Sequence, residues 1–163
     1  HNKVRQRDVK TSASLQFFRA AYGVSCKEEI EHMIKGKCLC GEISYQLNGE
    51  LLFLYNCHCE ECRAFSGASH ATSASISIND LSLTDGKGYL TAFETTKGTR
   101  YFCRNCGSPI YSYPVGAEEF PALHIGTITE PPEKELDANI WVSEKCPWVE
   151  LSRSAKIYEK SLT

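Results

Sequence analysis

The chain has 163 residues, of which 42% are hydrophobic and 23% are charged. These values are typical of one globular domain that buries roughly 70% of its unfolded surface, and they exclude a disordered chain. Lys and Arg total 18 against 20 Asp and Glu, which gives a formal net charge of −2. Because the basic excess of nucleic-acid-binding proteins is missing, we expect no nucleic acid partner.

The pattern of residues 1–36 predicts a helical N-terminal extension. Residues 37–163 are expected to form the main domain. Leu15, Phe18 and Tyr22 recur at helical spacing within the extension. The apolar face of this helix is expected to pack on the main domain or on a second copy of the chain. A homo-oligomer is therefore one of the arrangements that the sequence allows.

A second short helix is predicted directly after the first. The segment Ser25–Glu28 has the form of a capping box, and Gly36 stands where the helix would end. Ile30, Met33 and Ile34 would share one face of this helix. The sequence therefore predicts two helices before the main domain begins.

From residue 37 onward, short segments rich in β-branched and aromatic residues alternate with Gly, Asn and Pro. This pattern predicts a mainly β fold made of small antiparallel sheets. The expected strands are Glu42–Leu47, Leu52–Cys57, His70–Ile78, Tyr89–Glu94, Thr99–Phe102, Pro109–Tyr113, Ala122–Thr127 and Asn139–Val142. Three large aromatic side chains are also expected in the core, namely Phe120, Trp141 and Trp148.

Nine cysteines are many for a chain of this length, and seven of them fall into three tight groups. Cysteines one or two residues apart are poorly placed to bridge each other, which argues against a disulfide framework. The longest apolar run, Leu51–Tyr55, is too short for a signal or membrane segment. We therefore expect a reducing, cytoplasmic setting without a membrane partner, in which grouped cysteines bind metal.

Two of the groups are pairs that end in glycine. Cys38 and Cys40 precede Gly41, and Cys103 and Cys106 precede Gly107. A glycine here lets the backbone turn back, so that amide N–H groups point at the sulfurs. Two such pairs supply four thiolates, which is the ligand set of a closed structural zinc site.

The third group, Cys57, Cys59 and Cys62, lies within six residues. In extended chain Cys57 and Cys59 share a face, and a turn through Glu60-Glu61 would bring Cys62 beside them. Three ligands leave one position open, as in catalytic zinc sites. The alternative is a second structural site whose fourth ligand is one of five residues, namely Cys26, Cys146, His58, His70 or His124.

Charge indicates the chemistry of an open site. Three thiolates and one zinc ion sum to −3 + 2 = −1, so the centre would suit a soft thiol ligand better than the production of hydroxide. A thiol bound there as thiolate would attack a small aldehyde. Arg63 would offset the charge or bind a substrate carboxylate, and the small residues after it, Ser66 and Gly67 among them, would let a substrate approach closely.

Four segments together resemble the glutathione-dependent formaldehyde-activating enzyme family, a zinc-binding superfamily that also includes centromere protein V. The resemblance covers residues 36 to about 151. The segments are Gly36–Tyr45, Cys57–Arg63 with Ser66–Ala68, Arg100–Pro109, and Ile140–Ser143 through Pro147-Trp148.

The resemblance implies a tent-like arrangement of small sheets over zinc knuckles, with two zinc ions per chain. It implies that Cys38, Cys40, Cys103 and Cys106 hold a structural zinc, and that Cys57, Cys59 and Cys62 hold a catalytic one. The implied activity is that of a carbon–sulfur lyase, or a synthase in the other direction, which condenses glutathione with formaldehyde to S-hydroxymethylglutathione or forms the corresponding adduct of a related small thiol. Asn139 departs from the family pattern, in which His often stands at this position, and Cys146 stands where a small residue is usual.

Two other functions compete with this one. A non-catalytic interaction module would have two structural metal sites and would use the N-terminal helices to engage a partner. Chemistry like that of methionine sulfoxide reductases would need a free redox cysteine, and only Cys26 and Cys146 are unassigned.

Overall fold

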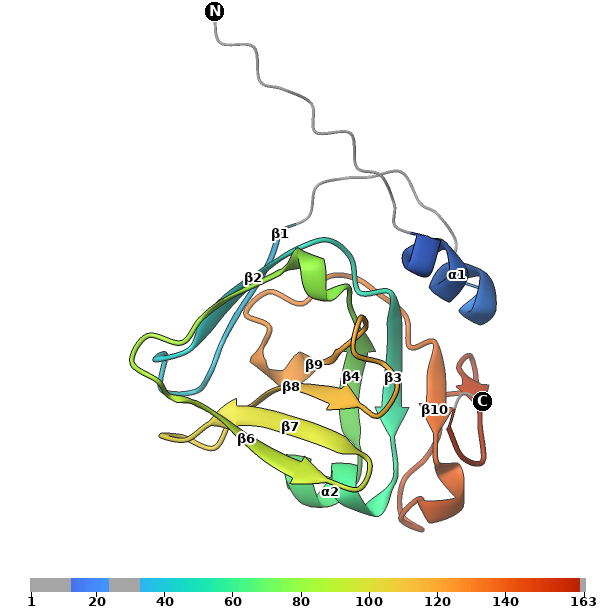
Figure 1. Ribbon diagram of the computed structural model, residues 1–163. Helices are drawn as coiled ribbons and strands as arrows, with labels where there is room; N and C mark the ends of the chain where they lie inside the picture. The colour runs from blue at the N-terminus through green and yellow to red at the C-terminus, as the bar shows by residue number, and fades with distance from the viewer. Residues whose placement is uncertain (1–12, 24–32, 162–163) are drawn as a thin grey trace, which may run out of the picture.

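The computed structural model describes residues 13–23 and 33–161, in which eleven strands form two sheets (Figure 1). The smaller sheet has the order β1-β2-β5 and the larger one the order β11-β10-β3-β4-β9-β8-β7-β6. Two α-helices are described, α1 (Ala13–Tyr22) and α2 (Glu60–Ser66). The mainly β fold predicted from the sequence is therefore confirmed.

Two strands of the smaller sheet alternate buried and exposed side chains. Its strands are β1 (Met33–Lys37), β2 (Ser44–Asn48) and β5 (Leu81–Thr84), and β1 and β2 both bury every second residue. Such alternation forms because one face of an antiparallel sheet packs on the core while the other meets water. The helix expected to end at Gly36 is therefore wrong for residues 33–36, and the rest of it lies outside the described residues.

The larger sheet contains most of the strands that the sequence predicts. Its strands are β3 (Phe53–Cys57), β4 (Ala71–Ser75), β6 (Leu90–Thr95), β7 (Gly98–Cys103), β8 (Pro109–Pro114), β9 (Ala122–His124), β10 (Ala138–Ile140) and β11 (Lys156–Ile157). Three short 3-10 helices follow strands or precede them, namely η1 (Ile78–Asp80), η2 (Ile125–Thr127) and η3 (Val142–Glu144). The expected strands over 70–78 and 122–127 therefore end early, and β5 and β11 were not predicted.

One strand departs from the antiparallel arrangement that the sequence predicts. β10 pairs in parallel with both β3 and β11. Parallel neighbours need a crossover connection of a dozen or more residues, and the chain between β10 and β11 runs from residue 141 to residue 155. This pairing places Ile140 beside Cys57, so the segment that follows β10 starts next to the third cysteine group.

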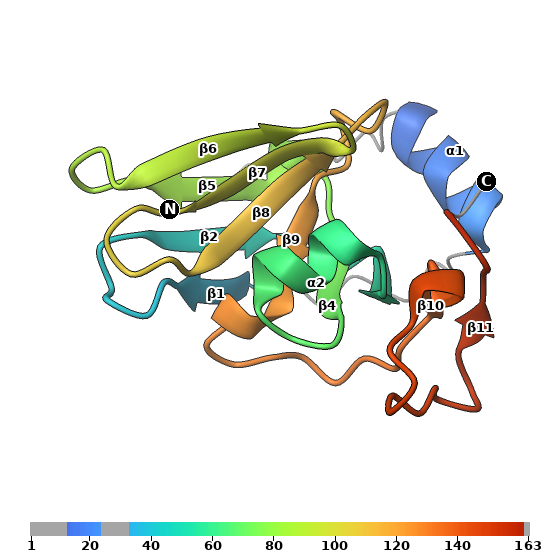
Figure 2. The ribbon, with the colours of Figure 1, turned by 90° about the horizontal axis from the view of Figure 1, so that it is seen from below.

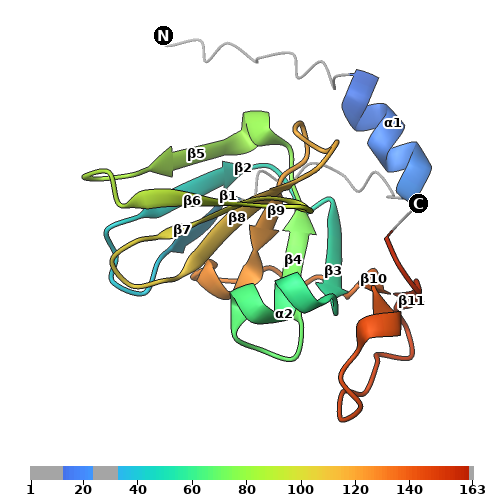
Figure 3. The ribbon, with the colours of Figure 1, turned by 60° about the horizontal axis from the view of Figure 1, so that its bottom comes forward.

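The N-terminal helix packs on the main domain, as one of the two sequence predictions states. The ring of Phe18 lies 4.5 Å from that of Phe120, and the ring of Tyr22 lies 5.6 Å from that of Phe53. Arg19 forms an ion pair with Glu50. Figures 2 and 3 show α1 on the same side of the molecule as β10 and β11, at the end opposite to β1, β2 and β5.

The core contains fully buried aliphatic side chains from both sheets and from the loops between them, among them Ile43, Leu47, Ile76, Ile110 and Leu123. Trp141 and Phe120 pack partly buried against a second cluster. Trp148 is 74% exposed, so the expectation that it lies in the core is wrong. Across the described ranges, we find no helix of the length and apolar character needed to cross a membrane.

Candidate metal centres

Cys38, Cys40, Cys103 and Cys106 form one cluster, in which all four Sγ atoms lie within 4.8 Å of one another. The Sγ atoms of Cys38 and Cys40 are 3.5 Å apart, and those of Cys40 and Cys103 are 3.7 Å apart. Tetrahedral zinc with Zn–S bonds of ~2.3 Å needs sulfurs about 3.8 Å apart. The four thiols therefore fit a closed tetrahedral zinc site.

The glycines after the two pairs have the backbone conformation that the sequence predicts. Gly41 has a φ of 82° and Gly107 a φ of 76°, both in the left-handed region. Each turn closes on its own first cysteine, since Gly41 N–H donates to the carbonyl of Cys38 and Gly107 N–H to that of Cys103. The resulting loops are two similar knuckles whose cysteine sulfurs face each other.

Hydrogen bonds favour the thiolate forms of two of the four cysteines, Cys40 and Cys106, whereas burial raises the pKa of Cys103. The N–H of Ile43 donates to Cys38 Sγ over 3.3 Å, and a backbone N–H at Glu42 lowers the pKa of Cys40. Burial acts to raise the pKa of Cys106, but hydrogen bonds from the side chain and backbone of Ser108 help to lower it to about 6. Thiolate is the form that binds a metal, so these bonds support the site.

The second cluster consists of Cys57, Cys59 and Cys62, whose three Sγ atoms also lie within 4.8 Å of one another. All three residues are buried, and the Sγ atoms of Cys57 and Cys59 are 3.6 Å apart. Cys57 ends β3, whereas Cys59 is the N-cap of α2 and Cys62 lies within that helix. The three thiols therefore converge as the sequence predicts.

Helix α2 replaces the turn and the first part of the small-residue loop that the sequence predicts. Glu60 and Glu61 occupy its first turn, where negative side chains stabilise a helix, and Gly67 ends it with a φ of 66°. A helix of seven residues is too short to be stable alone, and packing against β4 of the sheet stabilises this one. Cys62 is thereby held on a regular element rather than on a loop.

No fourth His, Cys, Asp or Glu joins the Cys57 cluster in the part of the chain that the structure describes. Three of the proposed fourth ligands have other partners: His58 contacts Asn139, His124 contacts two serines, and Cys146 contacts Arg63. His70 lies beside His58, with the ring centroids 5.2 Å apart. Cys26 lies outside the described residues.

Asn139, the departure from the family pattern, is part of a buried polar group behind the cluster. Its Oδ1 lies 3.1 Å from Nε2 of His58, and both residues are almost fully buried. Since the backbone N–H of His58 also donates to the carbonyl of Ile140, this contact ties the Cys57–Cys59 segment to β10. Three buried nitrogens here have no hydrogen-bond partner within the described ranges, namely His58 Nδ1, His70 Nδ1 and Asn139 Nδ2.

The electrostatics of the second cluster depend on Arg100, which sequence reasoning missed. Hydrogen bonds within the cluster lower the pKa of Cys59 and raise that of Cys57, so Cys59 is the preferred thiolate. The Arg100 guanidinium, buried on β7, interacts electrostatically with both Cys59 and Cys62. The sequence shows only that Arg100 stands within a predicted strand, and a buried arginine there needs a negatively charged partner, which Glu61 supplies.

Arg63, Ser66 and Gly67, which the sequence predicts to contact substrate, all have partners within the protein. Arg63 donates from Nε to the carbonyl of His58 over 3.1 Å and contacts Cys146 Sγ from Nη1 over 3.4 Å. The Ser66 hydroxyl lies within hydrogen-bonding distance of the carbonyls of Arg63 and His70. Gly67 caps α2. Their contacts with a substrate stay a prediction.

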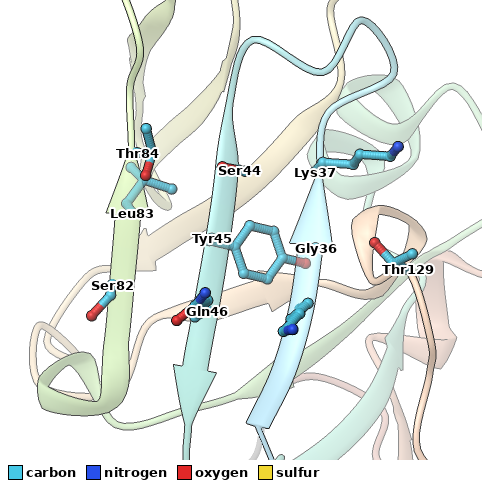
Figure 4. Close-up of a pocket in the computed structure, with 10 residues that line it drawn as sticks. Gly36, Lys37, Ser44, Tyr45, Gln46, Ser82, Leu83, Thr84 and Thr129 are labelled. Carbon is cyan, nitrogen blue, oxygen red and sulfur yellow. The ribbon is translucent and has the colours of Figure 1, made fainter.

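A hollow of about 390 Å³ lies over the smaller sheet, and no cysteine lines it (Figure 4). Its floor includes Tyr45, whose ring lies against Gly36 and whose hydroxyl is 3.0 Å from Thr127 Oγ1. Lys35, Lys37 and hydroxyl-bearing side chains surround it. The hollow therefore shares no lining residue with either cysteine cluster.

The fold and the two clusters define a mainly β protein with two cysteine-rich sites suited to metal. The model of the family described as glutathione-dependent formaldehyde-activating enzyme matches residues 33–144. The match covers more than half of the chain and both clusters, and the chain therefore belongs to this family.

Two individual proteins are also similar to this chain. One, from Halomonas elongata, has the provisional name glutathione-dependent formaldehyde-activating enzyme; it is 22% identical over 130 residues, which cover 73% of this chain and 81% of the relative. The other is a Rhodobacter sphaeroides protein of known crystal structure. It is 22% identical, with a TM-score of 0.51, and the match covers 60% of this chain and 90% of that one. The second similarity concerns the fold alone.

Proposed function

We propose that this protein joins a small thiol, with glutathione as the first candidate, to formaldehyde through a new carbon–sulfur bond. The thiol sulfur attacks the carbonyl carbon, the C=O π bond breaks, and the proton of the thiol ends on the carbonyl oxygen. The product is an S-hydroxymethyl thiol, and the reverse reaction is that of a carbon–sulfur lyase. Family membership supports the choice of these two substrates.

The proposal assigns one zinc ion to each cluster. Cys38, Cys40, Cys103 and Cys106 would hold a structural zinc, because four thiols leave no position free. Cys57, Cys59 and Cys62 would hold a catalytic zinc, whose chemical contribution is a positive charge that favours the thiolate form of an incoming thiol.

The chain's own residues contribute orientation and charge around the second cluster. Burial of the three cysteines limits access of water, and Arg100 offsets the excess negative charge of three thiolates. The contact between His58 and Asn139 holds the Cys57–Cys59 segment in place. Arg63, Ser66 and Gly67 remain our candidates for substrate contact, at the end of α2 next to the cluster.

The observation that most favours an enzyme is the incomplete ligand set of the Cys57 cluster. Three sulfurs converge there, and no fourth ligand joins them in the described parts of the chain. A purely structural zinc site is closed by four protein ligands. The described geometry therefore favours a catalytic site over the non-catalytic module.

Elemental analysis and product detection together test the proposal. Gently purified protein should contain about two zinc ions per chain, one of which becomes exchangeable with a chelator when glutathione is added. Proton NMR should show faster formation of S-hydroxymethylglutathione with the protein than without it. The proposal would be overturned if glutathione did not change the exchange of either zinc ion and the protein did not change the rate of S-hydroxymethylglutathione formation.

The proposal also covers the cellular location, the division of the chain into domains and its oligomeric state. A site that needs reduced thiolates is suited to the cytoplasm, where thiols stay reduced. We propose a helical N-terminal extension followed by a metal-binding β domain, with β1 assigned to that domain. Both clusters are built within one chain, so neither needs a second copy to complete it.

A further inference from the structure

The turn between β6 and β7, residues 95–98, lies beside the second cluster. The Thr96 hydroxyl donates to Glu61 over 3.1 Å, and Arg100 binds the other carboxylate oxygen of Glu61 over 3.2 Å. Glu61 precedes Cys62 on α2, so one contact from the turn and one from β7 fix this hairpin to the helix that holds the cysteine. Figure 1 shows this turn, α2 and the end of β3 at the same edge of the molecule.

Two hydrogen bonds of one side chain close the turn, which presents one cationic side chain. The Thr95 hydroxyl donates to the carbonyl of Gly98 over 2.9 Å and accepts from the N–H of Lys97 over 3.2 Å. The Lys97 ammonium lies 4.1 Å from the centre of a Trp141 ring. A cation held over an aromatic face loses little orientational freedom when it binds an anion.

Trp141 has an unusual backbone conformation. Its φ is 57°, and among the described residues it is the one non-glycine residue with a positive φ. It directly follows Ile140, which pairs with Cys57 in the sheet. Left-handed conformations of large residues cost about 1–2 kcal/mol and persist only where surrounding structure holds them, frequently at ligand sites.

Lys97 is incompletely neutralised where it lies. Its ammonium is 3.9 Å from Glu144 Oε1, a long ion pair, while the other oxygen of Glu144 accepts the Glu60 N–H over 2.7 Å. About a third of the Lys97 side chain is exposed. The ammonium is near the cluster, because Glu144 joins it to Glu60, the residue next to Cys59. The turn therefore offers a positive charge, open to solvent, beside three sulfurs.

We propose that Lys97, held over Trp141, binds a carboxylate of the thiol substrate and so selects thiols that bear a carboxylate over uncharged thiols. This inference rests on the proposed function, since it assumes that the sulfur of the substrate lies at the Cys57 cluster. The long contact with Glu144 is replaced by a shorter, charge-assisted bond to the substrate. The pair of Lys97 and Trp141 thus determines specificity and takes no part in bond formation.

The test compares glutathione with its diethyl ester, which keeps the thiol and the peptide but lacks both negative carboxylates. Their affinities for the zinc-containing protein are measured by isothermal titration calorimetry for wild type, Lys97→Gln and Lys97→Arg. The control, Lys87→Gln, removes the same charge from the turn at the other end of β6. We expect wild type to prefer glutathione about tenfold, Lys97→Gln to lose this preference, and Lys97→Arg and Lys87→Gln to keep most of it.

Each other outcome has a distinct meaning. If wild type binds glutathione and Lys97→Gln keeps the full preference, or weakens both ligands equally, the role of Lys97 is overturned while the proposed function stands. If wild type binds neither thiol and neither thiol changes the exchange of its zinc, the proposed function is overturned and this inference with it.

Discussion

The Sγ atoms of Cys40 and Cys103 lie 3.7 Å apart, although 63 residues separate the two cysteines along the chain. Cys40 lies in the loop between β1 and β2 of the smaller sheet, and Cys103 ends β7 of the larger one. A metal ion at this cluster would connect the two sheets. Its binding free energy would therefore count toward folding.

Replacing Cys103 with serine is expected to prevent stable folding. Structural zinc sites contribute ~10–16 kcal/mol of apparent binding free energy, whereas a domain has only ~5–15 kcal/mol of net stability. Thermal melting and zinc content of the purified variant measure the effect. Cys146→Ser is the control, because Cys146 is buried but belongs to neither cluster. A Cys103→Ser protein with unchanged melting and zinc content would contradict the pairing of the four cysteines.

Replacing Cys62 with serine is expected to remove one metal ion and leave the fold intact. The four-cysteine cluster that joins the sheets is untouched, and α2 keeps its contacts through Glu61. We expect half of the zinc to be lost while the melting temperature falls by only a few degrees, roughly 1 kcal/mol of stability. If the melting temperature of this variant falls as far as that of Cys103→Ser, the Cys57 cluster is structural and the open-site interpretation is wrong.

Gly36 is expected to tolerate no side chain. A Cβ at this position would overlap the ring of Tyr45, whose hydroxyl is held by Thr127 (Figure 4). Gly36→Ala should therefore lower the free energy of unfolding by about 1–3 kcal/mol through overpacking, measured by urea denaturation. Gly126→Ala is the matched control, since a Cβ there meets no atom within 4 Å. Equal stability of the two variants would show that Tyr45 moves aside freely.

Stability is expected to fall in acid partly because of His124. Burial, with a smaller effect of Arg100, lowers the pKa of His124 to about 4, against ~6.5 in the unfolded chain. The unfolded state thus binds a proton before the native state does. This contribution, on the order of 3 kcal/mol, is fully present above pH ~6.5 and is lost as the pH falls to about 4.

Urea denaturation at several pH values, for wild type and for His124→Gln, measures this loss. Protonation of the cysteine thiolates also destabilises the protein in acid, but it affects both proteins equally. Wild type should therefore lose more stability between pH 6.5 and 4 than the variant does. Parallel curves would mean that the pKa of His124 is the same in the native and unfolded states, which would contradict this prediction.

Local sequence patterns predicted much of the fold. The strands β2, β3, β6, β7 and β8 appear close to their expected bounds, because short runs of β-branched and aromatic residues between turn residues mark them in the sequence. β1 was missed because Ile34 fits a helical face as well as a strand face. α2 was missed because a seven-residue helix is not stable alone and depends on its packing against the sheet.

The two cysteine clusters could also be predicted, with the glycine turns of the first. Spacing fixes which sulfurs are near each other within one segment, and a glycine after the pair permits the left-handed turn. The neutralising cation could not be assigned in this way. Sequence proximity favoured Arg63, whereas the chain folds so that Arg100, 38 residues beyond Cys62, interacts with the thiolates.

By itself, the sequence determined a mainly β chain and three cysteine groups with ligand spacing, because both depend on residues close together in the chain. Only the tertiary structure decided that β10 runs parallel to β3, that Asn139 contacts His58, and that Lys97 lies over Trp141. These contacts join segments tens of residues apart. They form because the sheets and α2 must bury their apolar faces together, and no local pattern specifies which distant partners that packing brings into contact.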